Sequence, residues 1–187
     1  MCFVNGENVY PMPLSQDHKR AYDNDEGPNT GGMGAYTPLP FVTEEDEAFA
    51  RKYVLEAVAK GMCAEGLPLT GVLYGGLMKT AQGVKVIEFN ARFGDPETEV
   101  VLPLLESDAY DVFYGIATGL GLPSRESGIS PFSWRNEATI GVVLASKGYP
   151  GNYAKGAVIE GVELFDGPVF HMGTKNDNGV LKTNGGR

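Results

Sequence analysis

Residues 84–97 read VKVIEFNARFGDPE, and the first half of this run has the pattern of a β-strand. Side chains on a strand alternate between its two faces, so Val84, Val86, Glu88 and Asn90 are expected to share one face. A carboxylate and an amide oxygen at the end of that face are ligands that Mg²⁺ accepts, with water and phosphate completing its shell. The pattern therefore predicts a divalent-metal site made by Glu88 and Asn90.

Charged residues continue beyond the expected strand. Arg92 could hold a phosphate or a carboxylate with both arms of its guanidinium group. Asp95 and Glu97 add two carboxylates within the next five positions. Metal ligands, an anion-binding group and acids so close together suggest phosphoryl-group chemistry. For an isolated E-x-N-x-R pattern, solvated strand-end residues and a surface ion pair are the commoner explanation.

A second informative stretch lies in the first quarter of the chain. QDHKR at residues 16–20 is followed by a loop, residues 25–36, that contains GPNTGGMGAY. So many glycines, with Pro and Asn, exclude a regular element. Small residues let backbone amides approach an anion closely, although most glycine-rich stretches are merely loops.

Together, these stretches resemble the glycinamide ribonucleotide synthetase family, a branch of the ATP-grasp enzymes. EFNARFGDPE carries the ATP-grasp metal pattern, QDHKR…GPNTGGMGAY is the second long match, and LASKGYPG, GTK and TNGGR continue it to Arg187. The resemblance implies an α+β fold: the carboxy-terminal part of an ATP-grasp domain, as an antiparallel sheet with helices on one face, plus a truncated small β-rich C-terminal module. We expect the ATP-grasp part at residues 1–122, a linker at 123–136 and the β module at 137–187.

The resemblance also implies an activity: a ligase that joins glycine to 5-phosphoribosylamine in purine biosynthesis, with ATP as co-substrate cleaved to ADP and phosphate. The glycine carboxylate would attack the γ-phosphorus, and the amine would then displace phosphate from glycyl phosphate. Glu88 and Asn90 would bind Mg²⁺ or Mn²⁺, Arg92 would hold the acyl phosphate or the transferring phosphoryl group, and Asp95 would receive the glycine ammonium or the incoming amine. The expected substrate-binding residues are Asp17, His18, Lys19, Asn29, Thr30, Gly31, Gly32 and Gly34.

Parts of the family pattern are absent from the sequence. In many ATP-grasp enzymes the preceding strand supplies another acidic ligand, but here that region is Gly75-Gly76-Leu77-Met78. The family's amino-terminal domain, and the half of the ATP-grasp unit whose lysines hold phosphates, would precede residue 1. We therefore expect a carboxy-terminal portion of the enzyme, cut inside its last domain at Arg187 and inactive alone.

Composition narrows the remaining classes of function. The net charge is −9 without a basic run, which argues against nucleic acid and anionic membranes as partners. The sequence contains no membrane-length apolar run, and we expect no signal peptide. Its two cysteines, Cys2 and Cys63, suggest reduced thiols in a cytoplasmic protein. Two alternatives stay open: a different ATP-grasp carboxylate–amine ligase, and a non-catalytic scaffold or binding module.

The remaining patterns predict ordinary elements. Thr43-Glu-Glu-Asp46 is a capping-box pattern at the start of a helix. Helical spacing predicts an inward face that includes Phe49, Tyr53 and Val54. Hairpins are expected at residues 1–12 and 70–90, and short strands at 138–145, 157–159, 162–165, 169–172 and 180–183.

Overall fold

The computed structural model describes residues 1–122 and 131–187, and all of its strand pairs are antiparallel. The main sheet has the strand order β2-β1-β7-β8. Its strands are β1 (Cys2–Asn5), β2 (Asn8–Pro11), β7 (Thr70–Thr80) and β8 (Gly83–Asn90). Both predicted hairpins are therefore confirmed, and β1 and β7 join them edge to edge.

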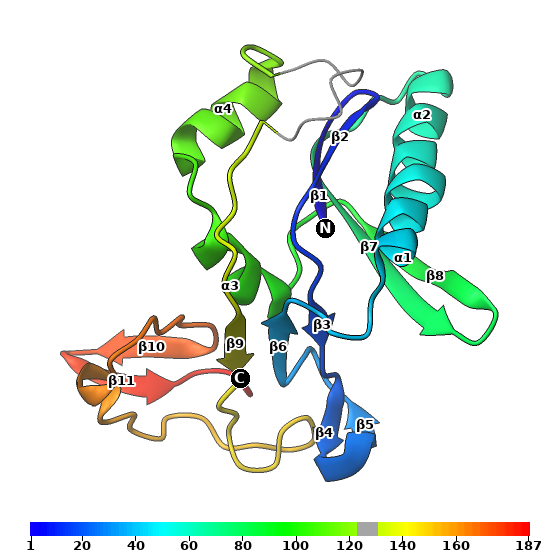
Figure 1. The fold of residues 1–187 in the computed structure, drawn as a ribbon. Coiled ribbons are helices and arrows are strands. Elements are labelled where there is room, and N and C mark those ends of the chain that lie inside the picture. Colours follow the sequence, from blue (N-terminus) through cyan, green and yellow to red (C-terminus); the bar gives the residue numbers. More distant parts are fainter. Residues whose placement is uncertain (123–130) are drawn as a thin grey trace.

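Helices cover both faces of this sheet, so the expectation of helices on one face is wrong, whereas the α+β class with an antiparallel sheet is confirmed (Figure 1). Cys2 and Val4 of β1 pack with Leu55 and Ala59 on one face, and Phe3 packs with the opposite group. The physical reason is that the consecutive residues Cys2, Phe3 and Val4 are all apolar and buried, so both faces of β1 must be covered. The helical segments are α1 (Glu44–Phe49), η2 (Ala50–Leu55), α2 (Glu56–Ala64), α3 (Glu97–Val101), η3 (Leu102–Leu104) and α4 (Ala109–Thr118).

Phe3 lies at the centre of the larger core. It is 1% exposed and makes edge-on ring contacts with Phe93, Phe113 and Phe132, at centroid distances of 6.2, 5.9 and 5.5 Å. Such contacts add to the free energy of burying each ring. Phe93 directly precedes the Gly94–Glu97 turn, so this cluster anchors the turn to the sheet.

The helix after residue 43 begins as predicted. Asp46 N–H donates to the Thr43 hydroxyl, and the Asp46 carboxylate accepts from Thr43 N–H, which is a complete capping box. The predicted inward face is wrong in part, because Phe49 and Tyr53 are 41% and 61% exposed while Val54 is buried. The segment η2 is a π-helical turn, whose wider turn rotates the following residues relative to a regular helix.

Only part of the carboxy-terminal segment forms a sheet of its own, because its first strand pairs with a strand from the first quarter of the chain. Strand β9 (Thr139–Val142) pairs with β6 (Gly34–Thr37), which also pairs with β3 (Gln16–Asp17). A further hairpin joins β10 (Thr174–Asp177) to β11 (Val180–Thr183), and β4 (Arg20–Tyr22) pairs with β5 (Glu26–Asn29). Figure 1 shows β9 lying beside β6 although more than one hundred residues separate them.

Two strand predictions in this segment are wrong. Residues 162–164 form a short 3₁₀ turn, and residues 169–172 are not part of a strand. Strand β11 and the bridge of Val158 to Lys182 agree with expectation. Of the expected linker, residues 123–130 lie outside the described residues, and the domain boundaries remain a prediction.

Both cysteines are free thiols, and Cys2 is buried. Burial raises the pKa of the Cys2 thiol to about 12, which makes it a poor nucleophile at neutral pH. Across residues 1–122 and 131–187, no helix combines the length and the apolar character needed to span a membrane.

Candidate active site

Glu88 and Asn90 lie on one face of β8, but Val84 and Val86 lie on the other. In the β7–β8 ladder Gly76 pairs with Glu88, whereas Leu77 pairs with Val86, so Ile87 is an extra residue. This β-bulge reverses the alternation, and the prediction of one continuous face from Val84 to Asn90 is wrong. The pairing of Asn90 with Tyr74 keeps the amide and the Glu88 carboxylate together on the Tyr74 side.

Glycine at position 76 makes room for Glu88. A Cβ there would lie 3.0 Å from Glu88 Cγ and 3.4 Å from Tyr74 Cε1. The Glu88 side chain therefore folds across the β7 backbone beside the Tyr74 ring. The strand position where the ATP-grasp resemblance suggested another acidic ligand is thus a glycine that leaves space for Glu88.

The donor set decides whether a divalent cation fits this face. Within residues 1–122 and 131–187, no three His, Cys, Asp or Glu side chains form a metal-binding group. Glu88 and Asn90 offer a carboxylate and an amide oxygen, and Glu88 is exposed. Mg²⁺ is commonly held by one or two protein oxygens with water and substrate phosphate, so this pair fits such an ion.

Tyr74 connects this face to the turn that starts α3. Its hydroxyl donates a 2.7 Å hydrogen bond to Glu97 Oε1, and Glu97 is only 4% exposed. Burial, followed by the hydrogen bond to Glu97, raises the pKa of Tyr74. The sequence pattern pointed to Glu97 only as one of the clustered acids at the end of RFGDPE, and it did not reveal the bond to Tyr74.

Asp17, the last residue of β3, and Lys19, two residues later, approach the same region. Lys19 Nζ lies 2.7 Å from Asp17 Oδ2, and the Asp17 side chain is 5% exposed against 48% for Lys19. Burial raises the pKa of Asp17, and the pairing with Lys19 opposes this effect; the charge of Glu97 acts on both groups. The structure thus brings Asp17 and Lys19 close to the Tyr74–Glu97 pair.

The glycine-rich loop is bonded within the protein. The amides of Thr30 and Met33 donate to the carbonyls of Lys19 and His18, each at 2.7 Å. The Gly32 amide donates to the Thr30 hydroxyl, and the Gly31 amide donates to the hydroxyl of Tyr149, both at 3.0 Å. The loop amides therefore have protein acceptors, and its proximity to Asp17 is the clearer link to the site.

The other predicted loop residues have defined places. Asn29 ends β5 and pairs with Arg20, and Gly34 begins β6 opposite Val142. The His18 ring stacks on Tyr36 with centroids 5.8 Å apart and is otherwise exposed. His18 lies beside Asp17 in sequence.

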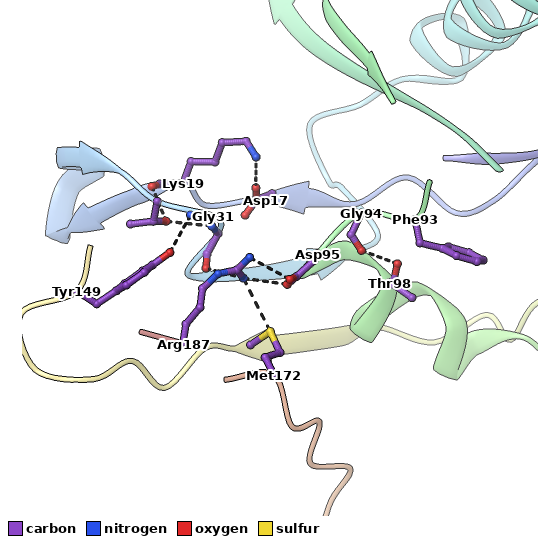
Figure 2. Close-up of polar contacts among 12 residues, drawn as sticks. Asp17, Lys19, Gly31, Phe93, Gly94, Asp95, Thr98, Tyr149, Met172 and Arg187 are labelled. Carbon is purple, nitrogen blue, oxygen red and sulfur yellow. Dashed lines mark hydrogen bonds and ion pairs between the residues drawn. The ribbon is translucent and has the colours of Figure 1, made fainter. Parts of the chain in front are cut away.

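Arg92 and Asp95 have different surroundings. Arg92 is exposed, and its Nη1 donates to the carbonyl of Phe93 at 2.7 Å. Asp95 accepts two hydrogen bonds from Arg187, Nη1 to Oδ1 at 2.8 Å and Nη2 to Oδ2 at 2.9 Å (Figure 2). Sequence reasoning missed Arg187, although it ends the TNGGR match.

Comparisons with known proteins identify the family of this chain. The family model "Phosphoribosylglycinamide synthetase, ATP-grasp (A) domain" matches residues 1–98, and the model of the C domain of the same family matches residues 139–187. A phosphoribosylamine–glycine ligase of Halalkalibacterium halodurans is 52% identical over all of this chain and 42% of its own length. The trifunctional purine biosynthetic protein adenosine-3 of Homo sapiens is 48% identical over all of this chain and 18% of its own length.

A solved structure agrees in fold. The crystal structure of phosphoribosylamine–glycine ligase from Thermotoga maritima has a TM-score of 0.83 and 33% identity, covering all of this chain and 44% of that one. The chain thus spans less than half the length of these relatives. Because the A-domain model alone matches more than half of the residues, the chain belongs to the phosphoribosylglycinamide synthetase family of ATP-grasp proteins.

Proposed function

We propose that this chain is part of an ATP-dependent ligase that joins 5-phosphoribosylamine and glycine in purine biosynthesis and cleaves ATP to ADP and phosphate. The observation that carries the proposal is the family match on residues 1–98, within which Glu88 and Asn90 share a face with Tyr74, next to the buried Glu97. The relatives named as ligases support the reaction.

Glu88 and Asn90 are the residues that would hold Mg²⁺ or Mn²⁺. The ion would supply positive charge to the phosphate oxygens of ATP. The exposure of Glu88 supports this role, because a nucleotide can approach the carboxylate from solvent.

Arg92 would bind the acyl phosphate or the phosphoryl group in transfer. Its guanidinium group has five N–H donors, and the bond to Phe93 uses one of them. Asp95 would receive an ammonium group only by exchanging it for Arg187, because both of its oxygens already accept from that residue.

Asp17, His18 and Lys19 would face the substrates from the β3 side. The Lys19 ammonium is half-exposed and available to an anionic group, whereas the buried Asp17 carboxylate holds it in place. The loop residues Asn29, Thr30, Gly31, Gly32 and Gly34 would shape this side of the site.

The remainder of the ligase would act as the partner of this chain. Three apolar residues of β8 are exposed: Val86 by 45%, Ile87 by 63% and Phe89 by 42%. Their exposure supports a further segment packing on β8, since contiguous apolar surface commonly marks an interaction site. We place the assembled enzyme in the cytoplasm, in keeping with the free thiols.

A chimeric enzyme tests the function. These 187 residues would replace the matching part of the Halalkalibacterium halodurans ligase, to which they are 52% identical. We expect ADP formation that depends on both glycine and phosphoribosylamine, and a Glu88→Ala chimera that folds but has lost most turnover. A folded, inactive chimera would favour a scaffold, and activity with another carboxylate would favour a different ATP-grasp ligase.

A further inference from the structure

We propose that Arg187 and Tyr149 are positioning residues of the candidate active site: they fix the glycine-rich loop and Asp95 against each other. Both residues lie in the segment that matches the C domain, whereas the groups they hold lie in the segment that matches the ATP-grasp domain. The catalytic consequence of this inference rests on the proposed function, but its structural part does not.

Arg187 binds two parts of the ATP-grasp segment with one guanidinium group. It makes a two-armed contact with Asp95, at 2.8 and 2.9 Å (Figure 2). Its Nη1 also donates to the carbonyl of Gly32 at 3.3 Å. The Arg187 side chain is 17% exposed. The Asp95 side chain is 45% exposed, so the strength of this pair comes from its two-armed geometry, which is more directional than an ordinary surface ion pair.

The backbone beside Arg187 is itself fixed. The amides of Asn184 and Gly185 donate to the carbonyl of Gly173 at 2.7 and 2.9 Å, and the Ser146 amide donates to the carbonyl of Gly186 at 2.7 Å. These three bonds hold the chain just before Arg187 on two sides. The guanidinium group is therefore presented from a braced backbone.

The loop lies directly on the two positioning side chains. The Gly31 amide donates to the Tyr149 hydroxyl at 3.0 Å. A Cβ at Gly31 would come within 2.5 Å of Arg187 Nη2, so the loop backbone is in close contact with the guanidinium group. Removing either side chain would free this part of the loop.

Movement of the loop would reach the substrate side of the site. A Cβ at Gly32 would lie 2.7 Å from Asp17 Oδ1 and would overlap the ring of Pro96. Gly32 is thus wedged between Asp17, which holds Lys19, and the turn that carries Asp95. Asp95 acts in this arrangement as the anchor for Arg187, and it would bind an ammonium group only after releasing that residue.

Hydrogen exchange on the 187-residue chain tests the structural part without any assay of activity. Tyr149→Phe removes the acceptor of the Gly31 amide, and we expect exchange at Gly31 to rise by about three- to tenfold, the value of one net hydrogen bond. Arg187→Met should raise exchange in the same loop. The matched control is Lys182→Met, which removes a 2.8 Å ion pair with Asp177 in the same segment. Loop exchange equal to that of the control would overturn the proposal.

The chimeric ligase tests the catalytic part. Arg187→Met should lower kcat/KM for glycine or phosphoribosylamine by about ten- to hundredfold, because misplaced groups cost that much, with KM for ATP unchanged. Arg187→Lys should recover part of the loss, since an ammonium group reaches one Asp95 oxygen. Loss of thermal stability with kcat and all KM values unchanged would show a structural role only and overturn the catalytic part. An unsubstituted chimera without activity would refute the proposed function instead, and the exchange result would then decide this inference.

Discussion

The Tyr74 hydroxyl donates a 2.7 Å hydrogen bond to the buried carboxylate of Glu97. This bond joins β7 to the first residue of α3 and holds the Gly94–Glu97 turn beside the Glu88–Asn90 face. It therefore couples the strand that presents the metal-binding candidates to the turn that carries Asp95.

Tyr74→Phe leaves Glu97 Oε1 without its donor in a buried place. We expect a loss of about 1–3 kcal/mol in the free energy of unfolding, the cost of an unsatisfied buried polar group. Urea titration of the chain measures it. Tyr114→Phe is the control, because the Tyr114 ring is 49% exposed on α4; equal losses in the two variants would contradict a special role for the Tyr74 bond.

Asn90→Ala should lower turnover of the chimeric ligase far more than its stability. An amide at the end of an edge strand contributes little to the core, but it is one of two proposed metal ligands. Steady-state kinetics and thermal unfolding of the same preparation make the comparison. A melting temperature reduced as much as by a core deletion such as Val101→Ala would remove Asn90 from the ligand set.

Arg92→Lys should be nearly as harmful to turnover as Arg92→Ala. A lysine supplies a point charge and cannot reproduce the planar pair of donors that binds a phosphate or an acyl phosphate. Kinetics of the two chimeras measure the effect, and Lys85→Met, on β8 and away from the turn that follows it, is a suitable control. Near-normal kinetics in Arg92→Lys would exclude Arg92 from the site.

Gly32→Ala should destabilise the chain by about 2–4 kcal/mol, in the range of overpacked or strained positions. Gly32 has φ of 122°, and its Cβ would meet both Asp17 and Pro96. Gly83→Ala isolates the conformational part of the cost, because Gly83 has φ of 93° and open space around its Cβ position. For Gly83→Ala we expect a loss of about 1 kcal/mol in the free energy of unfolding. A smaller loss for Gly32→Ala than for Gly83→Ala would mean that Gly32 is not in close contact with Asp17 and Pro96.

Asp17 should make the chain less stable as the pH rises above its ordinary pKa of 3.8. Burial raises its pKa in the folded state, so in that window the folded chain binds more protons than the unfolded chain, and stability falls with increasing pH. Asp17→Asn should flatten this fall. Urea unfolding at successive pH values from 4 to 7 measures it, with Glu99→Gln as a comparison, because burial raises the pKa of Glu99 too. A steeper fall in Asp17→Asn would show the opposite sign.

The sequence by itself determined the local elements and the family. Asn5-Gly6 and Thr80–Gly83 lie at the two hairpin turns, and Thr43 with Asp46 forms the capping box, because short-range geometry and hydrogen bonding set these features. The long matches around Asp17 and Glu88 identified the ATP-grasp relatives without coordinates.

Only the tertiary structure decided which faces and which distant residues meet. The bulge at Ile87 puts Val86 and Glu88 on opposite faces of β8, and the π-helical turn moves Tyr53 outward. Each adds one residue to the regular geometry, and the order of apolar and polar residues in the sequence does not reveal where that residue is added. The pairing of Asp95 with Arg187 joins residues 92 positions apart. A contact of this kind depends on the packing of the whole chain, which no local spacing records.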